Sequence, residues 1–315
     1  MKKVLLLLLM LLFTISSSSK DFKYHPKTKD ELQELIENES IYLSDIDTSA
    51  ITDMSYLFVR EKTKIDACGT AYDYKTTKRK NFSGIGKWDT SNVTNMRGLF
   101  YNLKNFNEDI SAWNTSKVED MLSMFEGAEK FNQPLNNWDV SKVKLMKNMF
   151  RGAISFNQSL NRWNVSEVID MEEMFEAAYT FNQPLNSWDV SNVKNMSYMF
   201  NSTKEFNQPL DKWNVSNVED MSYMFSNAKK FNQSINSWNV SKVKYMDYMF
   251  NEADSFNQSL NLWDVSNVDT MQCMFCEAKN FNQDLSMWKV QGATATVNMF
   301  LGSALENRKP KWVGH

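Results

Sequence analysis

The amino-acid sequence predicts an α/β repeat solenoid, a stack of about ten 25-residue units with a cap at each end. The main observation is the spacing of tryptophan. Nine of the ten tryptophans stand 25 residues apart, at positions 88, 113, 138, 163, 188, 213, 238, 263 and 288, and Trp312 follows 24 residues later. A fixed period of this length is typical of stacked units that cover one another.

The other large apolar residues follow the same period. One unit reads L-x-x-W-[DN]-V-S-x-V-x-x-M-x-x-M-F-x-x-A-x-x-F-N-Q, and two of its positions hold 17 of the 20 methionines. Phenylalanine recurs at two further positions, with Phe82 one residue out of step. A single unit cannot bury both of its faces, so we expect neighbouring units to build one continuous core.

Residues 1–19 are predicted to be a secretory signal peptide. Lys2 and Lys3 precede an apolar run that ends at Ile15, and four serines follow. The run is too short for a transmembrane helix, so we expect an exported protein with no transmembrane span. An uncleaved membrane anchor is the alternative.

Residues 20–45 are predicted to cap the first repeat. Thr28 and Glu31 form a capping box that opens a short helix. The repeats occupy residues 46–300, and the first unit starts with Ile46 in place of tryptophan. Residues 301–315, which include Trp312, are predicted to form the C-terminal cap.

An insertion interrupts the repeats at residues 59–81. It holds seven Lys or Arg and three Asp or Glu, which makes it positive by four. We interpret it as a solvated loop, with a contact for an anionic partner as the alternative. Its deletion is expected to leave thermal stability nearly unchanged.

Within each unit, the Trp-[Asp/Asn]-Val triplet is predicted to be a short strand, because its side chains alternate between inside and outside. Spacings of three and four from the next valine through the methionines and phenylalanine predict about two helical turns. The serine after the strand can cap them. In the Phe-Asn-Gln loop, the aligned amides are expected to bond to loop carbonyls and to one another.

Residues 26–300 resemble the BspA-like leucine-rich-repeat surface proteins, in the branch with W-[DN]-V-S-x-V-x-x-M-x-x-M-F units. The lead-in PKTKDELQELI also resembles that group. The resemblance implies a leucine-rich-repeat-like solenoid with strands on its concave side. It also implies a secreted or surface-displayed protein of host-associated microbes that adheres to host or extracellular-matrix proteins, without catalytic residues. The start of the chain lacks a cysteine after the apolar run, and the inserted loop is a second departure.

A candidate partner-binding face follows from the direction of the side chains. If tryptophan and valine point inward, the residue between them points outward. This row consists of Asp89, Asn114, Asp139, Asn164, Asp189, Asn214, Asn239 and Asp264. We expect its asparagines to donate hydrogen bonds to both neighbours and to separate the charges. The row then satisfies itself, offers an acidic strip to a partner, or provides weak calcium sites.

The row one residue before tryptophan also points outward. Its members are Lys87, Ala112, Asn137, Arg162, Ser187, Lys212, Ser237, Leu262 and Met287. It changes from polar to apolar toward the C-terminus. We therefore expect a protein contact that Leu262 and Met287 anchor and to which Arg162 and Lys212 belong.

Other classes of function are disfavoured. The formal net charge is −3 and no basic stripe is present, which disfavours nucleic-acid binding. The two histidines lie near the chain ends, and no phosphate loop, nucleophile elbow or metal motif appears, so we expect no enzyme, metal or cofactor. We interpret Cys273 and Cys276 as incidental thiols and expect that Cys68 pairs with neither.

The sequence thus favours a monomeric protein that binds a host or matrix protein through its solenoid surface. The alternative is a structural cell-envelope protein that assembles with itself. An enzyme that uses a pair of the exposed aspartates ranks third. A monomer in solution would favour binding, and concentration-dependent filaments would favour the structural function.

Overall fold

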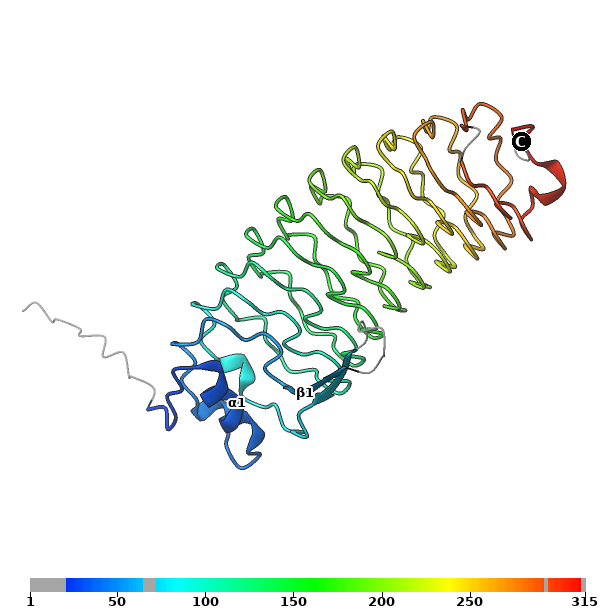
Figure 1. Ribbon diagram of the computed structural model, residues 1–315. Helices are drawn as coiled ribbons and strands as arrows, with labels where there is room; N and C mark the ends of the chain where they lie inside the picture. The colour runs from blue at the N-terminus through cyan, green and yellow to red at the C-terminus, as the bar shows by residue number, and fades with distance from the viewer. Residues whose placement is uncertain (1–20, 65–71, 292–293, 313–315) are drawn as a thin grey trace, which may run out of the picture.

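The chain forms an elongated stack of similar layers in a computed structural model that describes residues 21–64, 72–291 and 294–312. Helix α1 (Lys29–Glu37) lies at one end and the C-terminal segment at the other (Figure 1). The predicted signal peptide lies outside the described residues. Within those residues, no helix is long and apolar enough to cross a membrane.

Parallel bridges join the layers at one repeat position. They link ten residues, each just before the first methionine position of its unit, from Asp53 and Asn95 to Ala295. The solenoid and its approximate number of units are therefore confirmed. The Trp-[Asp/Asn]-Val triplet keeps its alternation of buried and exposed side chains, but it forms no strand in the described residues, so that prediction is wrong. The bridges between layers lie six residues further along the unit.

The helical turns predicted in each unit are wrong, because α1 is the one α-helix in the described ranges. The segment from methionine to alanine consists instead of successive tight turns. In one layer the amide of Met199 donates to Met196 O at 3.2 Å, and Asn201 repeats this bond to Tyr198 O at 3.0 Å. Tyr198 itself has a φ of 57°, in the left-handed region that interrupts a helix.

The amides between these turns point to the next layer. Tyr198 N donates to Ser222 O at 2.9 Å, Phe200 N to Met224 O at 2.9 Å and Ser202 N to Ser226 O at 2.8 Å. Corresponding bonds recur in the methionine turns from layer to layer, so on this wall donors face the C-terminal end of the stack and acceptors face the N-terminal end, whereas Lys194 N donates the opposite way, to Ile169 O at 3.0 Å. This direction gives the two ends different chemistry.

Aromatic columns fill the core. Trp163 and Trp188 stack with their ring centres 6.4 Å apart and 2° between their planes. Phe175 lies 5.7 Å from Phe200 in the next layer and 4.1 Å from Phe181 in its own. These separations suit offset stacking of aromatic rings. Each layer therefore gives its rings to a core that neighbouring layers share.

Buried polar groups are also paired between layers. The indole of Trp188 donates to Leu160 O of the preceding layer at 3.0 Å. In the Phe-Asn-Gln loop, Asn157 Oδ1 accepts from Asn182 N at 2.9 Å and from Gln183 Nε2 at 3.0 Å. The predicted pairing of loop amides is confirmed, and it continues along the stack with the same geometry.

The N-terminal cap follows the prediction. Thr28 Oγ1 accepts from Glu31 N at 3.2 Å, which starts α1, and Leu32 and Ile36 are fully buried against the first layer. The 3₁₀ turns η1 (Leu43–Asp45) and η2 (Ile85–Lys87) lie beside this cap. Ile46 is buried at the position that tryptophan holds in later layers.

The insertion differs from the predicted loop. Strands β1 (Val59–Lys64) and β2 (Tyr72–Thr76) form an antiparallel hairpin. Next to it, buried Arg79 donates to Ile36 O at 2.8 Å and to Ile41 O at 2.5 Å. The insertion therefore ties the end of α1 to the repeats, and from this contact we expect its deletion to lower thermal stability, in contrast to the prediction from the sequence.

The C-terminal cap extends the columns by one step. Trp312 stacks on Trp288 with ring centres 6.1 Å apart, and its indole donates to Leu285 O at 3.0 Å. The turn η3 (Glu306–Arg308) precedes it. Residues 313–315 of the predicted cap lie outside the described residues.

Candidate protein-binding face

All eight Asp and Asn side chains of the row after tryptophan are exposed, as predicted. Their hydrogen bonds differ from the prediction. Each Oδ1 accepts from the backbone N–H of the serine two residues later, for example Asp189 from Ser191 at 3.0 Å and Asn214 from Ser216 at 3.2 Å. The side chains thus close local turns and do not pair along the row, because this turn bond forms within one layer.

Three aspartates of this row have a pKa below its usual value. Hydrogen bonds from the hydroxyl and amide of Ser141 hold the pKa of Asp139 below its usual value, and Ser191 does the same for Asp189. Ser266 lowers the pKa of Asp264 in the same way. The row is therefore a strip of fixed, partly negative polar groups at neutral pH.

The row before tryptophan is also exposed throughout, including Arg162 and Lys212. The guanidinium of Arg162 donates to Asn137 Oδ1 at 3.4 Å within this row. Leu262 and Met287 expose 71% and 77% of their surface. Two large apolar side chains one repeat apart thus lie on an otherwise polar wall.

Leu262 and Met287 line a surface hollow of about 280 Å³. Trp263, Asp264, Ser266 and Lys289 complete its lining. The hollow combines an apolar rim with one carboxylate and one ammonium group. It could hold an apolar side chain of a partner together with a polar group beside it.

The structure also reveals a second outward surface, on the wall formed by the methionine turns. Tyr198, Tyr223 and Tyr248 stack one above another, with ring centres 4.3 Å and 4.6 Å apart. Burial raises the pKa of Tyr198 to about 12. The sequence analysis missed this column because it placed these residues on a helix. The 25-residue spacing of the tyrosines could have indicated the stack.

A charged cluster precedes the tyrosine column. The guanidinium of Arg151 lies 2.9 Å from Glu173, 2.7 Å from Glu176 and 3.2 Å from Glu126. Burial raises the pKa of Glu173 to about 7, although Arg151 opposes this effect. Three carboxylates thus share one guanidinium, which leaves the cluster with excess negative charge.

The two later cysteines are bonded to each other. Cys273 and Cys276 form a disulfide with their Cα atoms 4.7 Å apart, so their interpretation as incidental thiols is wrong. Cys68 lies outside the described residues. The C-x-x-C spacing allows the bond because Cys273 has a φ of 49° and starts a tight turn.

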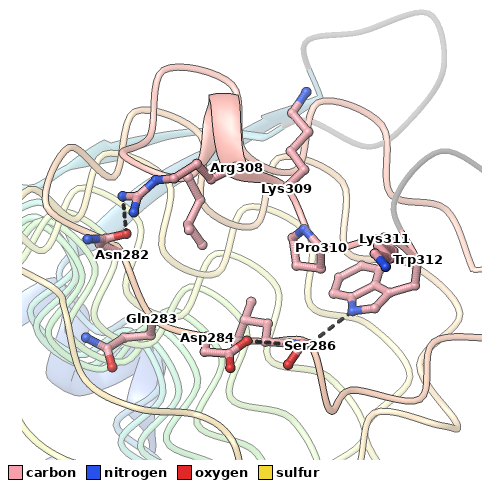
Figure 2. Close-up of a pocket in the computed structure, with 11 residues that line it drawn as sticks. Asn282, Gln283, Asp284, Ser286, Arg308, Lys309, Pro310, Lys311 and Trp312 are labelled. Carbon is pink, nitrogen blue, oxygen red and sulfur yellow. Dashed lines mark hydrogen bonds between the residues drawn. The ribbon is translucent and has the colours of Figure 1, made fainter.

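The described ranges contain no group of three or more His, Cys, Asp or Glu side chains arranged to hold a metal ion. The calcium interpretation of the Asp and Asn row therefore has no support from these residues. A hollow of about 540 Å³ lies at the C-terminal end (Figure 2). Arg308 donates to Asn282 at its edge, and the indole of Trp312 forms part of its lining.

The fold and the exposed rows define a repeat solenoid with an extended surface. Comparison with protein families agrees with this class. The family described as "Mycoplasma protein of unknown function, DUF285" matches three times in tandem, over residues 70–178, 135–230 and 208–312. The chain belongs to this family, since these matches span more than half of it. No curated protein and no solved structure matches the chain.

Proposed function

We propose that this chain is an exported, non-catalytic binding protein that contacts another protein through the wall around tryptophan. The partner is of the host or extracellular-matrix type, as expected from the resemblance to BspA-like leucine-rich-repeat surface proteins. We also propose that these repeats are homologous to the repeats of that group. It requires no metal or cofactor.

The exposure of Leu262 and Met287 carries this proposal. Their 71% and 77% exposure is unusual among the apolar residues of the repeats, most of which are buried. Interfaces gain most of their binding energy from a few large side chains that partners desolvate, and polar groups around them exclude water. The Asp and Asn row and Lys289 provide such a polar surround here.

A double variant tests the wall. Leu262→Ser with Met287→Ser is compared with the wild type and with Ser187→Ala plus Ser237→Ala, a control in the same row. Each protein serves as bait for extracellular-matrix and serum proteins, and the affinity of each captured protein is measured.

The double variant is expected to lose at least about tenfold in affinity, since burying each apolar side chain contributes about 1.5–3 kcal/mol. The control should bind as the wild type does. An unchanged affinity for every partner after both serine substitutions would contradict the proposal.

The second candidate function is a structural one, in which the protein assembles with itself at the cell envelope. Its motivating observation is that α1 contains four carboxylates and one lysine, whereas residues 306–311 contain three basic residues and one carboxylate. This function uses a different surface from the wall around tryptophan.

A further inference from the structure

Helix α1 and the segment from Glu306 to Lys311 carry opposite charge. Helix α1 contains one lysine and four carboxylates, which gives a net charge of −3. The segment from Glu306 to Lys311 contains one carboxylate and three basic residues, which gives +2. These segments lie at opposite ends of the elongated molecule (Figure 1).

Several of these charges have no counter-ion among the residues that the structure describes. Asp30 and Glu34 of α1 are exposed and form no ion pair among the described residues. The same holds for Lys309 and Lys311, which border the hollow in Figure 2. Each end therefore presents charged side chains that a second molecule can pair with.

Backbone polarity adds a second difference between the ends. In the last layer, Thr296 N, Asn298 N and Phe300 N donate to no acceptor among the described residues, whereas in earlier layers the equivalent amides donate to the next layer. Gly302 N donates to a carboxylate oxygen of Glu306 at 3.0 Å. The C-terminal end thus has free backbone N–H donors, and one of its amides already donates to a carboxylate.

The first layer shows the converse arrangement. Gln33 Nε2 donates to Leu57 O at 3.1 Å and to Val59 O at 2.8 Å, in place of a preceding layer. The carbonyls of Asp53 and Ser55 accept from no donor among the described residues. Acceptors therefore remain at the N-terminal end.

Apolar surface is exposed at both ends as well. Val297 and Leu301 of the last layer expose 62% and 46% of their surface. Tyr42, in the N-terminal cap, exposes 64%. An apolar residue at each end gives a contact between ends some hydrophobic area besides its charges.

We propose that copies of this chain associate head to tail, with the C-terminal end of one copy on the N-terminal cap of the next. Lys309 and Lys311 face Asp30 and Glu34 across this contact. A second copy fits because one chain carries both members of each complementary pair. The contact is heterologous and leaves a free end on each copy, so it builds a linear assembly.

Such an assembly leaves the wall around tryptophan free. Each added copy would repeat the Leu262 and Met287 surface along the assembly, so a clustered partner would be bound at several points. The inference rests on the second candidate function, self-assembly, and not on binding through the wall around tryptophan. Failure of one leaves the other intact, because different residues test them.

Salt dependence provides the first test. Sedimentation velocity of the mature chain is measured over a range of concentrations at about 0.01 M and about 1 M ionic strength, where charges act over about 30 Å and about 3 Å. We expect larger species with rising concentration at low salt and a monomer at high salt. A monomer at every concentration in low salt would overturn the proposal.

Charge reversal provides the second test. One variant carries Asp30→Lys and Glu34→Lys, and the other carries Lys309→Glu and Lys311→Glu. Each variant alone has two ends of like charge and should remain monomeric. Their equimolar mixture should assemble again, because every end then meets an end of opposite charge.

A matched control carries Lys87→Glu and Lys212→Glu on the wall around tryptophan and should assemble as the wild type does. Circular dichroism checks that all variants fold. Assembly of either end variant alone, or a mixture that stays monomeric while both variants are folded, would overturn the proposal. Loss of assembly in the control would place the contact on the wall around tryptophan, which would also contradict the proposal.

Discussion

At the scale of single residues, left-handed backbone positions shape each layer. They occur in pairs four residues apart, for example Asn148 with φ 59° and Gly152 with φ 65°. One layer later, Glu173 and Ala177 have φ of 56° and 54°. For residues other than glycine this conformation costs about 1–2 kcal/mol, so the layers contain strain that the stack stabilises.

A reciprocal pair of substitutions tests this strain. A Cβ at Gly152 would lie 3.7 Å from the Cα of Gly127, an ordinary contact, so Gly152→Ala changes little besides the backbone preference. We expect it to destabilise the protein by about 1 kcal/mol. Ala177→Gly should stabilise it by up to about 1 kcal/mol at the equivalent position. Thermal unfolding measures both, and shifts of the same sign would contradict the interpretation.

The raised pKa of Glu173 predicts a pH dependence. Burial favours its protonated form, so the folded state binds this proton up to about pH 7 and the unfolded state releases it near pH 4 to 5. The contribution of this group to stability is therefore greatest below that lower range and is lost as the pH rises toward 7.

Glu173→Gln removes this titration. The variant should therefore gain in thermal midpoint relative to the wild type at pH 8, and gain less or lose at pH 5, where the wild type carries the proton. The control is Glu167→Gln, an exposed position of the same layer. A pH-independent difference between Glu173→Gln and the wild type would refute the assigned burial effect.

At the scale of structural elements, the tryptophan column combines packing with hydrogen bonding. Trp188 stacks on Trp163 and donates to the buried carbonyl of Leu160 at 3.0 Å. Trp188→Phe keeps a ring but removes one of two donors to that carbonyl, which still accepts from Trp163 N at 3.1 Å, so it should cost about 0.5–1.5 kcal/mol. Trp188→Ala also opens a cavity and should cost about 3–5 kcal/mol. Thermal unfolding measures both losses. No loss in Trp188→Phe would show that the hydrogen bond contributes nothing, and equal losses in the two variants would show that the packing of the ring adds nothing.

The N-terminal cap depends on one side chain of the insertion. Arg79 donates to the carbonyls of Ile36, Asn38 and Ile41, which would otherwise lack these partners. Arg79→Ala should destabilise the cap by about 2–4 kcal/mol, through loss of charged hydrogen bonds. In this variant, the amides of α1 should exchange faster than in the wild type, and the increase should be larger in α1 than in the central layers. Unchanged exchange in α1 would contradict this function of Arg79.

The sequence predicted the core well and the backbone poorly. Periodic residues such as Trp188 and Phe200 had to lie inside, because a stack is the arrangement that buries them all. The spacing of three and four that suggested a helix also fits successive tight turns. Tyr198, Glu173 and Cys273 gave no signal of left-handed backbone, although Gly127 and Gly152 lie at a second such position.

The candidate face was predictable only in part. Exposure of Leu262 and Met287 follows from the alternation around tryptophan, and the structure agrees. The turn bonds of the Asp and Asn row depend on local backbone geometry, which the alternation alone does not specify. The contact of Arg79 with Ile36 joins residues 43 positions apart, beyond the range of any local pattern.

At the scale of the whole molecule, the protein is close to one-dimensional. Each layer contacts its two neighbours through aromatic rings, bridges and directed amide bonds, and the caps replace the missing neighbours at the ends. Gln33 supplies donors at the first layer, and Glu306 supplies an acceptor at the last. Stability should therefore depend on the number and the phase of the layers.

Deletion in and out of phase tests this central claim most directly. Removal of residues 186–210, one full period, should leave a folded protein with native-like tryptophan fluorescence and circular dichroism and a cooperative thermal transition. Removal of residues 186–197 breaks the phase and should destroy the transition. A protein that tolerates both deletions equally, or neither, would contradict the stacked-layer account.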